Sequence, residues 1–236
     1  MSPTLRGMLR RLGFEPRRPT LPLRGWEQPG VPTPLLNALS DAELEELNAL
    51  LPWNCFTVDR AGRRFGAAAG PGKRDTPQPV PDPRIEALHR RVDLTSKSIL
   101  EIGCFEGVHT AGLCGLARAV TAVDGRVENV VKTIVRTALY GFHPQVLVCN
   151  VEDKTHAGRL PASDVVHHVG VLYHLVDPAA HLAAVARLTR HTLMLDTHYA
   201  PAEEASEAYE WEGRALRFKP YREFGHRDLL DRKSVV

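Results

Sequence analysis

The sequence predicts an α/β fold in which a mostly parallel sheet is covered by helices on both faces. Between residues 98 and 200, short apolar segments alternate with longer amphipathic ones. Strands that are apolar along their whole length are typical of a parallel sheet buried on both faces. A glycine-containing turn also joins the first of these strands to the first helix, which is where α/β folds of this kind bind their ligands.

The composition limits the class of protein. The 236 residues suit one α/β domain with an appendage, and 43% apolar with 25% charged residues is ordinary for a globular protein. The formal net charge of +2 does not predict nucleic-acid binding. The four cysteines are scattered without a CxxC pair, which argues against a disulfide scaffold and a cysteine-based zinc site. No apolar run approaches about 20 residues, and no secretory signal is found. We therefore expect a cytoplasmic protein without a membrane segment.

Residues 1–92 are expected to form an appendage with three main parts. The first is a basic, proline-rich arm over 1–34, whose first 26 residues hold six arginines against one acid. Such an arm could contact RNA phosphates, with a solvated terminus as the alternative. The second is a helix over 41–51, because Ser40 begins a capping-box sequence and leucines follow at helical spacing. The third is a Gly/Pro-rich loop over 66–81.

Three shorter segments of the appendage also carry signals. Leu5–Leu12 could form a short helix before the prolines begin. Phe56–Val58, followed by polar turn residues, predicts a hairpin or a strand with a loop. Pro83 is typical of a first helical position and introduces a short amphipathic helix that leads into the main domain.

Residues 93–236 are expected to form the main domain. Its strands and helices alternate, which is the pattern of parallel strands joined by helical crossovers. The predicted strands are Ser98–Ile102, Ala119–Val123, Gln145–Cys149, Asp164–Val169 and Thr192–Leu195, and the predicted helices are Val108–Arg118, Val127–Tyr140 and Pro178–Thr189.

The turn between the first strand and the first helix reads Glu-Ile-Gly-Cys-Phe-Glu-Gly from Glu101 to Gly107. Gly103 allows a tight turn and a close approach of the backbone to a ligand, and Gly107 opens the helix. Phe105 stands where the dinucleotide fingerprint has its middle glycine, which disfavours an NAD-type oxidoreductase. A bound pyrophosphate also wants no acid beside it. The carboxylate of Glu101 suits an ammonium group better, so we expect a nucleoside that carries an amino acid.

A second acid follows the second strand. Asp124 lies at the end of that strand, 23 positions after Glu101. An acid at this place can accept hydrogen bonds from both hydroxyls of a bound ribose. A glycine turn and two acids in register are stronger evidence for a nucleoside site than a lone glycine turn.

These residues resemble motif I of class I S-adenosylmethionine-dependent methyltransferases, in the variant whose turn reads G-C-x-x-G. The resemblance runs from about residue 98 to 200 and implies a Rossmann-like fold with S-adenosylmethionine as cofactor and S-adenosylhomocysteine as product. It implies that the turn holds the methionine part, that the acid holds the ribose, and that the segment after the third strand lies against the adenine. The residues so assigned are Glu101, Gly103, Cys104, Phe105, Gly107, Asp124, Gly125, Asn150, Val151 and Glu152.

A Gly-Val-Leu-Tyr-His segment follows the fourth strand. Because ligands bind beyond the carboxyl ends of parallel strands, we expect His168, Tyr173 and His174 to face the floor or rim of the pocket. The segment is similar to that of tRNA wobble-uridine carboxymethyltransferases. This resemblance implies that Val169 lies near the nucleoside with the adenine segment, and that Tyr173 lies near the reactive end of the cofactor. Those enzymes also use an arginine from a longer C-terminal part, so we expect an ordinary methyl donor.

The candidate catalytic residues are Tyr173, His174 and His198. A histidine can deprotonate a hydroxyl or amine acceptor near neutral pH, although simple packing of His174 and His198 is an equal alternative. His109 is expected to lie beside the backbone or the cofactor. A metal site could be drawn from Asp196 and the histidines at the ends of the fourth and fifth strands (His167, His168, His174 and His198), but their spacing matches no compact ligand motif. We therefore expect no metal.

The segment after the fifth strand is short for this fold. Glu203–Ala208 is predicted as a helix, and Trp211–Phe218 could supply one strand or a lid. An abbreviated C-terminal edge of the sheet is therefore expected.

The sequence thus predicts an S-adenosylmethionine-dependent methyltransferase acting on a small-molecule or RNA acceptor. The alternatives are a carboxymethyltransferase acting on tRNA wobble uridine and a non-catalytic cofactor-binding module. Acceptor choice is expected to depend on the appendage and on residues 199–224, because acceptor pockets lie outside the nucleotide-binding core. No pattern in the sequence indicates the oligomeric state.

Overall fold

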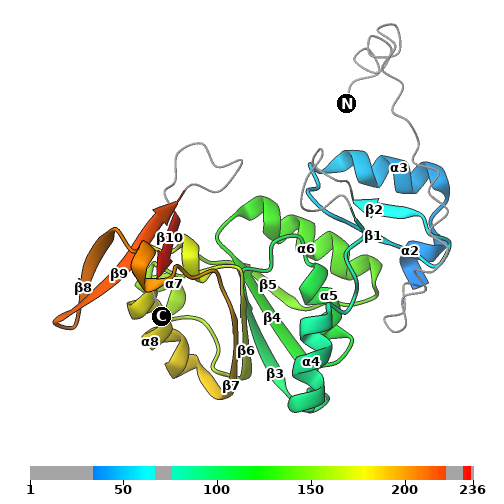
Figure 1. Cartoon of the computed structure of the whole chain (residues 1–236). Coiled ribbons are helices and arrows are strands. Elements are labelled where there is room, and N and C mark those ends of the chain that lie inside the picture. The colour runs from blue at the N-terminus through cyan, green and yellow to red at the C-terminus, as the bar shows by residue number, and fades with distance from the viewer. Residues whose placement is uncertain (1–33, 67–75, 222–230, 235–236) are drawn as a thin grey trace, which may run out of the picture.

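The computed structural model describes residues 34–66, 76–221 and 231–234. At its centre is a five-stranded parallel sheet with the strand order β5-β4-β3-β6-β7 (Figure 1). The first of these strands along the chain, β3, is the central one. The chain then adds β4 and β5 on one side of β3 and crosses back to add β6 and β7 on the other side. The strands are β3 (Ser98–Ile102), β4 (Ala119–Asp124), β5 (Gln145–Val148), β6 (Ser163–Val169) and β7 (Thr189–Asp196).

Helices cover both faces of this sheet, because neighbouring residues of each strand point to opposite faces. On one face, Ile99 packs with Ile85 and Leu113, which belong to α4 and α5. On the other face, Leu100 packs with Val185 of α8. The predicted α/β fold, Rossmann-like with helices on both faces, is therefore confirmed. The helices are α4 (Pro83–Arg91), α5 (Val108–Cys114), α6 (Val127–Leu139), α7 (Lys154–Ala157) and α8 (Pro178–Leu188).

Within residues 98–200, the boundaries of the predicted elements differ from the observed ones by more than one residue at two places. The helix expected to reach Arg118 ends at Cys114, where Gly115 follows as the C-cap. The last strand of the parallel sheet begins at Thr189 rather than Thr192, and a register irregularity next to Ser163 absorbs the added residues. The predicted helix from Pro83 is confirmed, and Asp82 caps it by accepting a hydrogen bond from Arg84 N.

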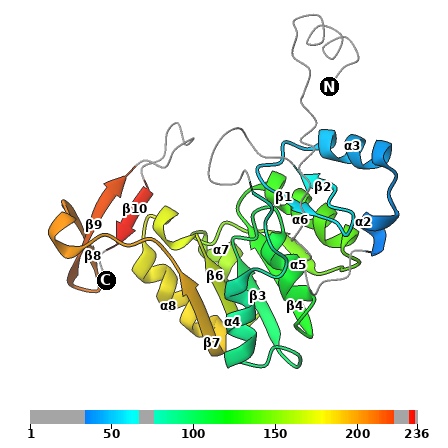
Figure 2. The same ribbon diagram turned by 45° about the vertical axis from the view of Figure 1, so that its right-hand side comes forward.

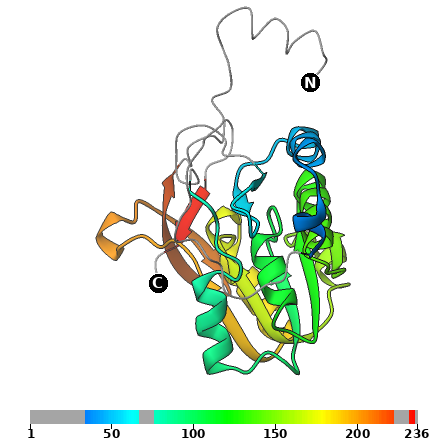
Figure 3. The same ribbon diagram turned by 90° about the vertical axis from the view of Figure 1, so that its right-hand side faces the viewer.

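The appendage packs on one end of the sheet domain, where Leu36, Trp53 and Phe65 form a core with Val108 and Ala111 of α5. Figures 2 and 3 show its blue and cyan elements next to the green helices of the main domain. It contains α2 (Pro34–Ala38), α3 (Asp41–Leu50) and an antiparallel hairpin of β1 (Phe56–Val58) and β2 (Arg64–Gly66). The basic arm before residue 34, with the helix expected over 5–12, and most of the 66–81 loop lie outside the described residues.

The predicted start of the 41–51 helix is confirmed. Glu43 N donates to Ser40 Oγ at 3.3 Å, and Ser40 N donates to Glu43 Oε2 at 2.8 Å, which together form the capping box. The helix ends at Leu50, one residue before the expected end.

The C-terminal prediction was wrong in one respect. Glu203–Ala208 was expected as a helix, but only one turn of 3-10 helix, η2 (Ala202–Glu204), forms before β8 (Glu207–Trp211). β8 pairs with β9 (Arg214–Tyr221), and β9 pairs with β10 (Asp231–Ser234). The ring of Tyr209 meets Phe218 edge to face at 6.1 Å, so aromatic packing across the hairpin outweighs the helical propensity of the acidic segment.

Within the described residues the parallel sheet ends at β7, and β8, β9 and β10 form a separate sheet. The expected abbreviation of the sheet is thus observed. This second sheet and the appendage lie at opposite ends of the molecule (Figures 1 and 2). None of the described helices is long and apolar enough to cross a membrane.

Candidate cofactor and acceptor site

The glycine turn closes tightly over the end of β3. Gly103 has a φ of +80°, and a Cβ atom there would lie 2.2 Å from Val171 Cγ2. Gly107 has a φ of +78°, and a Cβ atom there would lie 2.8 Å from Thr133 Cα. Both positions therefore require glycine for conformation and for space. Gly103 N and Cys104 N both donate to Val123 O, at 2.8 and 3.0 Å, which ties the turn to β4.

Asp124 holds the turn from the neighbouring strand. Its Oδ2 accepts a hydrogen bond from Phe105 N at 3.0 Å. Its Oδ1 accepts from Arg126 N at 2.9 Å and from Asn129 Nδ2 at 3.0 Å. A carboxylate offers about four acceptor positions, so this half-buried group keeps room for a hydroxyl donor at Oδ2.

The segment after β5 reaches the same edge of the sheet. Asn150 Oδ1 accepts from Glu152 N at 3.1 Å, which folds the segment into a turn. Glu152 Oε1 accepts from Val176 N at 2.6 Å, so this side chain links the segment to the loop beyond β6. Gly125 is exposed, and the nearest atom to a Cβ there would be Cys149 O at 3.9 Å. The structure therefore brings the predicted ribose and adenine residues together at the carboxyl ends of β4 and β5.

Glu101 lies directly below the turn, on the sheet face covered by α4 and α5. It is 1% exposed, and its Oε2 accepts from Thr110 Oγ1 at 2.6 Å. Its Oε1 is buried and has no hydrogen-bond partner among the described residues. Burial raises the pKa of Glu101 to about 7, although nearby His109 and the bond from Thr110 lower it. This carboxylate lacks a positive partner on one oxygen.

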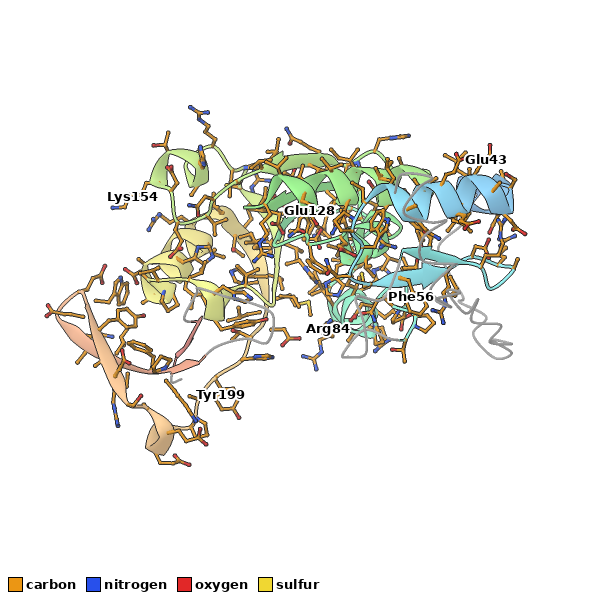
Figure 4. All side chains as sticks on the ribbon, turned by 90° about the horizontal axis from the view of Figure 1, so that it is seen from above. Glu43, Phe56, Arg84, Glu128, Lys154 and Tyr199 are labelled. Atoms are coloured by element: carbon orange, nitrogen blue, oxygen red, sulfur yellow. The ribbon has the colours of Figure 1, made fainter. Side chains whose placement is uncertain are left out.

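The three candidate catalytic residues lie together beyond β6 and β7. Tyr173 and His174 belong to η1 (Leu172–His174), a 3-10 turn that follows β6. The ring of His198 stacks on Tyr173 at 4.5 Å between centroids with 8° between the planes, and His174 lies 4.2 Å from the same ring. Tyr173 is 9% exposed, whereas His198 is exposed. We call these three side chains the aromatic cluster. The next residue, Tyr199, points outward (Figure 4).

The structure corrects the expected position of His168. It is fully buried in β6, with His168 Nε2 2.9 Å from His181 Nε2 of α8, so it does not face the pocket floor. His167 is its neighbour in the strand and points to the opposite face, where its ring meets His109 at 5.3 Å. Burial lowers the pKa of both, to about 3 for His167 and about 4 for His168. The four histidines therefore do not form one group. Val169, at the end of the strand, is half-buried at the carboxyl edge.

A buried charged network supports the turn, and no sequence signal identified it. Glu106, within the turn, accepts hydrogen bonds from Asn54 N at 2.8 Å and from Lys132 Nζ at 2.8 Å. Arg136 Nε donates to Glu106 O at 2.6 Å. Glu106, Lys132 and Arg136 are all fully buried. Burial alone would raise the pKa of Glu106, but the bonds from Lys132 and Asn54 hold it below its usual range. The network joins the turn to α6 and to the appendage.

A second polar chain crosses from α4 to β7. Arg84 Nη1 donates to Asp196 Oδ2 at 2.7 Å, and Arg84 Nε donates to Asp82 Oδ1 at 2.8 Å. Arg84 Nη2 lies 3.2 Å from His109 Nε2. His109, expected to neighbour the backbone or the cofactor, therefore lies beside Arg84, Asp82 and His167. Figure 4 labels Arg84 between the appendage and the side of the molecule that carries Tyr199.

This fold and turn define the class I S-adenosylmethionine-dependent methyltransferase fold: a parallel sheet of this order, a glycine turn after its first strand and an acid after its second. Solved structures agree with it. The N-terminal domain of EvdMO1, solved with SAH bound, matches 84% of this chain and 82% of its own with a TM-score of 0.65 at 22% identity. A structure of EvdMO1 matches 72% of this chain and 37% of its own, with a TM-score of 0.53 at 26% identity.

Curated relatives cover a smaller part of the sequence. The ubiquinone biosynthesis O-methyltransferases of Thiobacillus denitrificans and Xanthomonas euvesicatoria are each 31% identical to the chain over 108 residues. These residues are 45% of this chain and 46% and 44% of the two relatives, so the chain matches about half the length of each. No family profile matches the sequence. The comparisons give no support to the resemblance to tRNA carboxymethyltransferases.

Proposed function

We propose that this protein is an S-adenosylmethionine-dependent methyltransferase that methylates a hydroxyl group of a small molecule. The observation that carries the proposal is the common edge on which three features meet. These are the glycine turn, the carboxylate of Asp124 and the aromatic cluster, which stand at the carboxyl ends of β3, β4 and β6–β7. Ligands of open α/β sheets bind at this edge, beside the point where the strand order reverses.

The residues at this edge fit the cofactor. Asp124 Oδ2 keeps an acceptor position for a ribose hydroxyl, and the open space at Gly125 admits the sugar beside it. We propose that the turn binds the methionine part and that the segment after β5 lies against the adenine. The proposed contact residues are Gly103, Cys104, Phe105, Gly107, Asp124, Gly125, Asn150, Val151, Glu152 and Val169. Glu101, below them, offers its unpaired oxygen to the ammonium group of the methionine part.

The acceptor is proposed from the relatives and the aromatic cluster. The curated relatives are O-methyltransferases by name, and the EvdMO1 domain was also solved with SAH and D-fucose present. Both point to a hydroxyl acceptor. Small molecules are favoured over RNA because the formal net charge is only +2. We also propose that the chain divides into an appendage (1–92) and a methyltransferase domain (93–236).

Methyl transfer needs little from the protein beyond the correct positioning of the methyl donor and the acceptor. When bound, the cofactor would supply a methyl group activated by its sulfonium, and S-adenosylhomocysteine would remain after the transfer to the acceptor oxygen. Tyr173 and His198 stack at 4.5 Å and present a flat face on which a ring-bearing acceptor can lie. An imidazole of His198 or His174 accepts the proton that the hydroxyl loses.

The test is a turnover assay on the full chain. The protein is incubated with S-adenosylmethionine and a panel of phenols, catechols and sugars, and S-adenosylhomocysteine and methylated product are measured by mass spectrometry. We expect S-adenosylhomocysteine to form only when a hydroxyl acceptor is present. The product mass separates methyl from carboxymethyl transfer. Tight cofactor binding with no product from any acceptor would instead indicate the non-catalytic module.

The aromatic cluster gives a prediction about rate. His198→Ala is expected to lower kcat/KM by about 10²–10⁴-fold if the ring is the general base, with S-adenosylhomocysteine affinity unchanged. Tyr173→Phe keeps the stack and should change the rate less than Tyr173→Ala. His191→Ala, at an exposed histidine in β7, is the matched control. A His198→Ala enzyme with unaltered rate and pH profile would remove the ring from the mechanism.

A further inference from the structure

Glu101, His109 and His167 form a compact group below the glycine turn, which we call the Glu–His–His cluster. Each residue offers one oxygen or nitrogen atom, and these three atoms lie within 4.8 Å of one another. Glu101 of β3 and His167 of β6 are direct neighbours in the strand register. His109 comes from the first turn of α5, and its ring meets that of His167 edge to face.

Polar atoms of this cluster lack partners. Both ring nitrogens of His167 and Glu101 Oε1 are buried, and none of the three has a hydrogen-bond partner among the described residues. The two side chains are each 1% exposed. Buried polar atoms are almost always paired, because an unpaired one costs free energy. Unpaired atoms on both side chains therefore indicate a ligand that binds Glu101 Oε1 and one of the two nitrogens of His167.

The surrounding charges favour a cation. Arg84 is the positive group beside the cluster, and it already pairs with Asp82 at 2.8 Å and with Asp196 at 2.7 Å. Asp82, Asp196 and Glu101 are three carboxylates against this one guanidinium. Acidic groups therefore outnumber the guanidinium beside the cluster, which favours a cation over an anion. Asp82 Oδ2 also lies 3.4 Å from His109 Nε2, and a carboxylate beside a metal-binding histidine usually fixes its ring.

We propose that the Glu–His–His cluster binds a divalent transition-metal cation of the Zn²⁺ type. Two imidazoles and a carboxylate are a known ligand set for zinc, whereas Mg²⁺ and Ca²⁺ prefer oxygen ligands alone. Zinc bonds of about 2.0–2.2 Å place ligand atoms roughly 3.4 Å apart. Separations of up to 4.8 Å must therefore shorten by at most about 1.4 Å. His109 is best able to move, because its side chain is 22% exposed.

Such an ion would join β3, β6 and α5 directly beneath the turn. His109 is half-buried and is the member of the cluster nearest to solvent. The proposal goes beyond the methyltransferase function. Glu101 is the residue that both proposals use, whereas His109 and His167 are not among the proposed cofactor contacts.

The test is metal binding by the full chain after dialysis against a chelator. Zn²⁺ is titrated by calorimetry, and Co²⁺ by its visible absorption. We expect one ion per chain and a Co²⁺ spectrum without a thiolate charge-transfer band. His167→Phe removes a ligand but keeps a ring of similar size, and should weaken Zn²⁺ binding by about 100-fold or more. It should also raise the melting temperature in chelator, since an unpaired buried imidazole is gone. His109→Asn provides a second ligand variant.

The metal titration includes a control variant and has outcomes that would overturn the site. His191→Ala removes an exposed histidine, 62% accessible, from β7 and should leave the affinity unchanged. Equal Zn²⁺ binding by wild type, His167→Phe and His109→Asn would overturn the site, as would no binding of either metal by the wild type. A third outcome combines two results: the wild type binds no metal, and the Glu101→Gln variant loses S-adenosylhomocysteine binding. This outcome would assign Glu101 Oε1 to the ammonium group of the cofactor and overturn the metal site. Absence of S-adenosylhomocysteine binding by the untreated wild type would count against the proposed function and not against the metal site.

Discussion

Replacing Gly103 with alanine is expected to abolish detectable S-adenosylhomocysteine binding, whereas the same change at Gly62, in the turn between β1 and β2, should be tolerated. The added Cβ at Gly103 would lie 2.2 Å from Val171 Cγ2, and the φ of +80° is unfavourable for any residue with a side chain. At Gly62, which has a similar φ of +76°, no atom would lie within 4 Å of the added Cβ. The turn would have to shift in the first variant only.

A double variant separates the two causes of this effect. Val171→Ala removes the clashing methyl group but leaves the backbone strain, which is worth about 1–2 kcal/mol. Gly103→Ala with Val171→Ala should therefore recover part of the binding measured by calorimetry. Normal affinity of the single Gly103→Ala variant would show that the turn does not approach the cofactor.

Replacing Glu106 with glutamine is expected to cost about 3–5 kcal/mol of unfolding free energy, measured by urea denaturation. The reason is that the positive charges paired with Glu106 are buried. Lys132 and Arg136 are fully buried, and Glu106 is the buried carboxylate between them, with contacts of 2.8 and 3.9 Å. Among the described residues, its loss leaves Lys132 paired with Glu128 alone, which is 54% exposed, and leaves Arg136 without an ion-pair partner.

Two further variants test this explanation. Glu128→Gln, in the first turn of α6, removes a partner of the same lysine at a half-exposed position, and should cost about 1 kcal/mol or less. Glu106→Gln combined with Lys132→Met removes both members of the buried pair and should recover stability. If Glu106→Gln and Glu128→Gln cost the same small amount, the network does not hold the turn to the appendage.

The sequence predicted the sheet domain well because its signals are local. Short apolar strands, the glycine turn and Asp124 are each recognised within a few residues, and the strand order follows from the fold class. The aromatic cluster was also predicted, since Tyr173, His174 and His198 all follow strand ends. These signals do not depend on what packs against each segment.

The errors arose where distant contacts decide the outcome. His168 was assigned to the pocket because it is near a strand end, but the alternation of β6 directs it to His181. The Glu106 network joins residues more than 50 positions apart, so no local pattern indicates it. The segment over 203–208 has helical composition, yet the hairpin formed through Glu212 and Gly213, both with positive φ, takes it into β8.

Calorimetry of cofactor binding tests the central claim most directly. The wild-type protein should bind S-adenosylhomocysteine at one site per chain and should not bind NAD. Asp124→Ala should weaken that binding about 10-fold or more, which corresponds to the loss of a hydrogen bond to a charged group. Asp93→Ala, at an exposed acid in the loop before β3, should bind normally, and circular dichroism should show that both variants are folded. Tight binding of NAD with no response to S-adenosylhomocysteine would contradict the assignment.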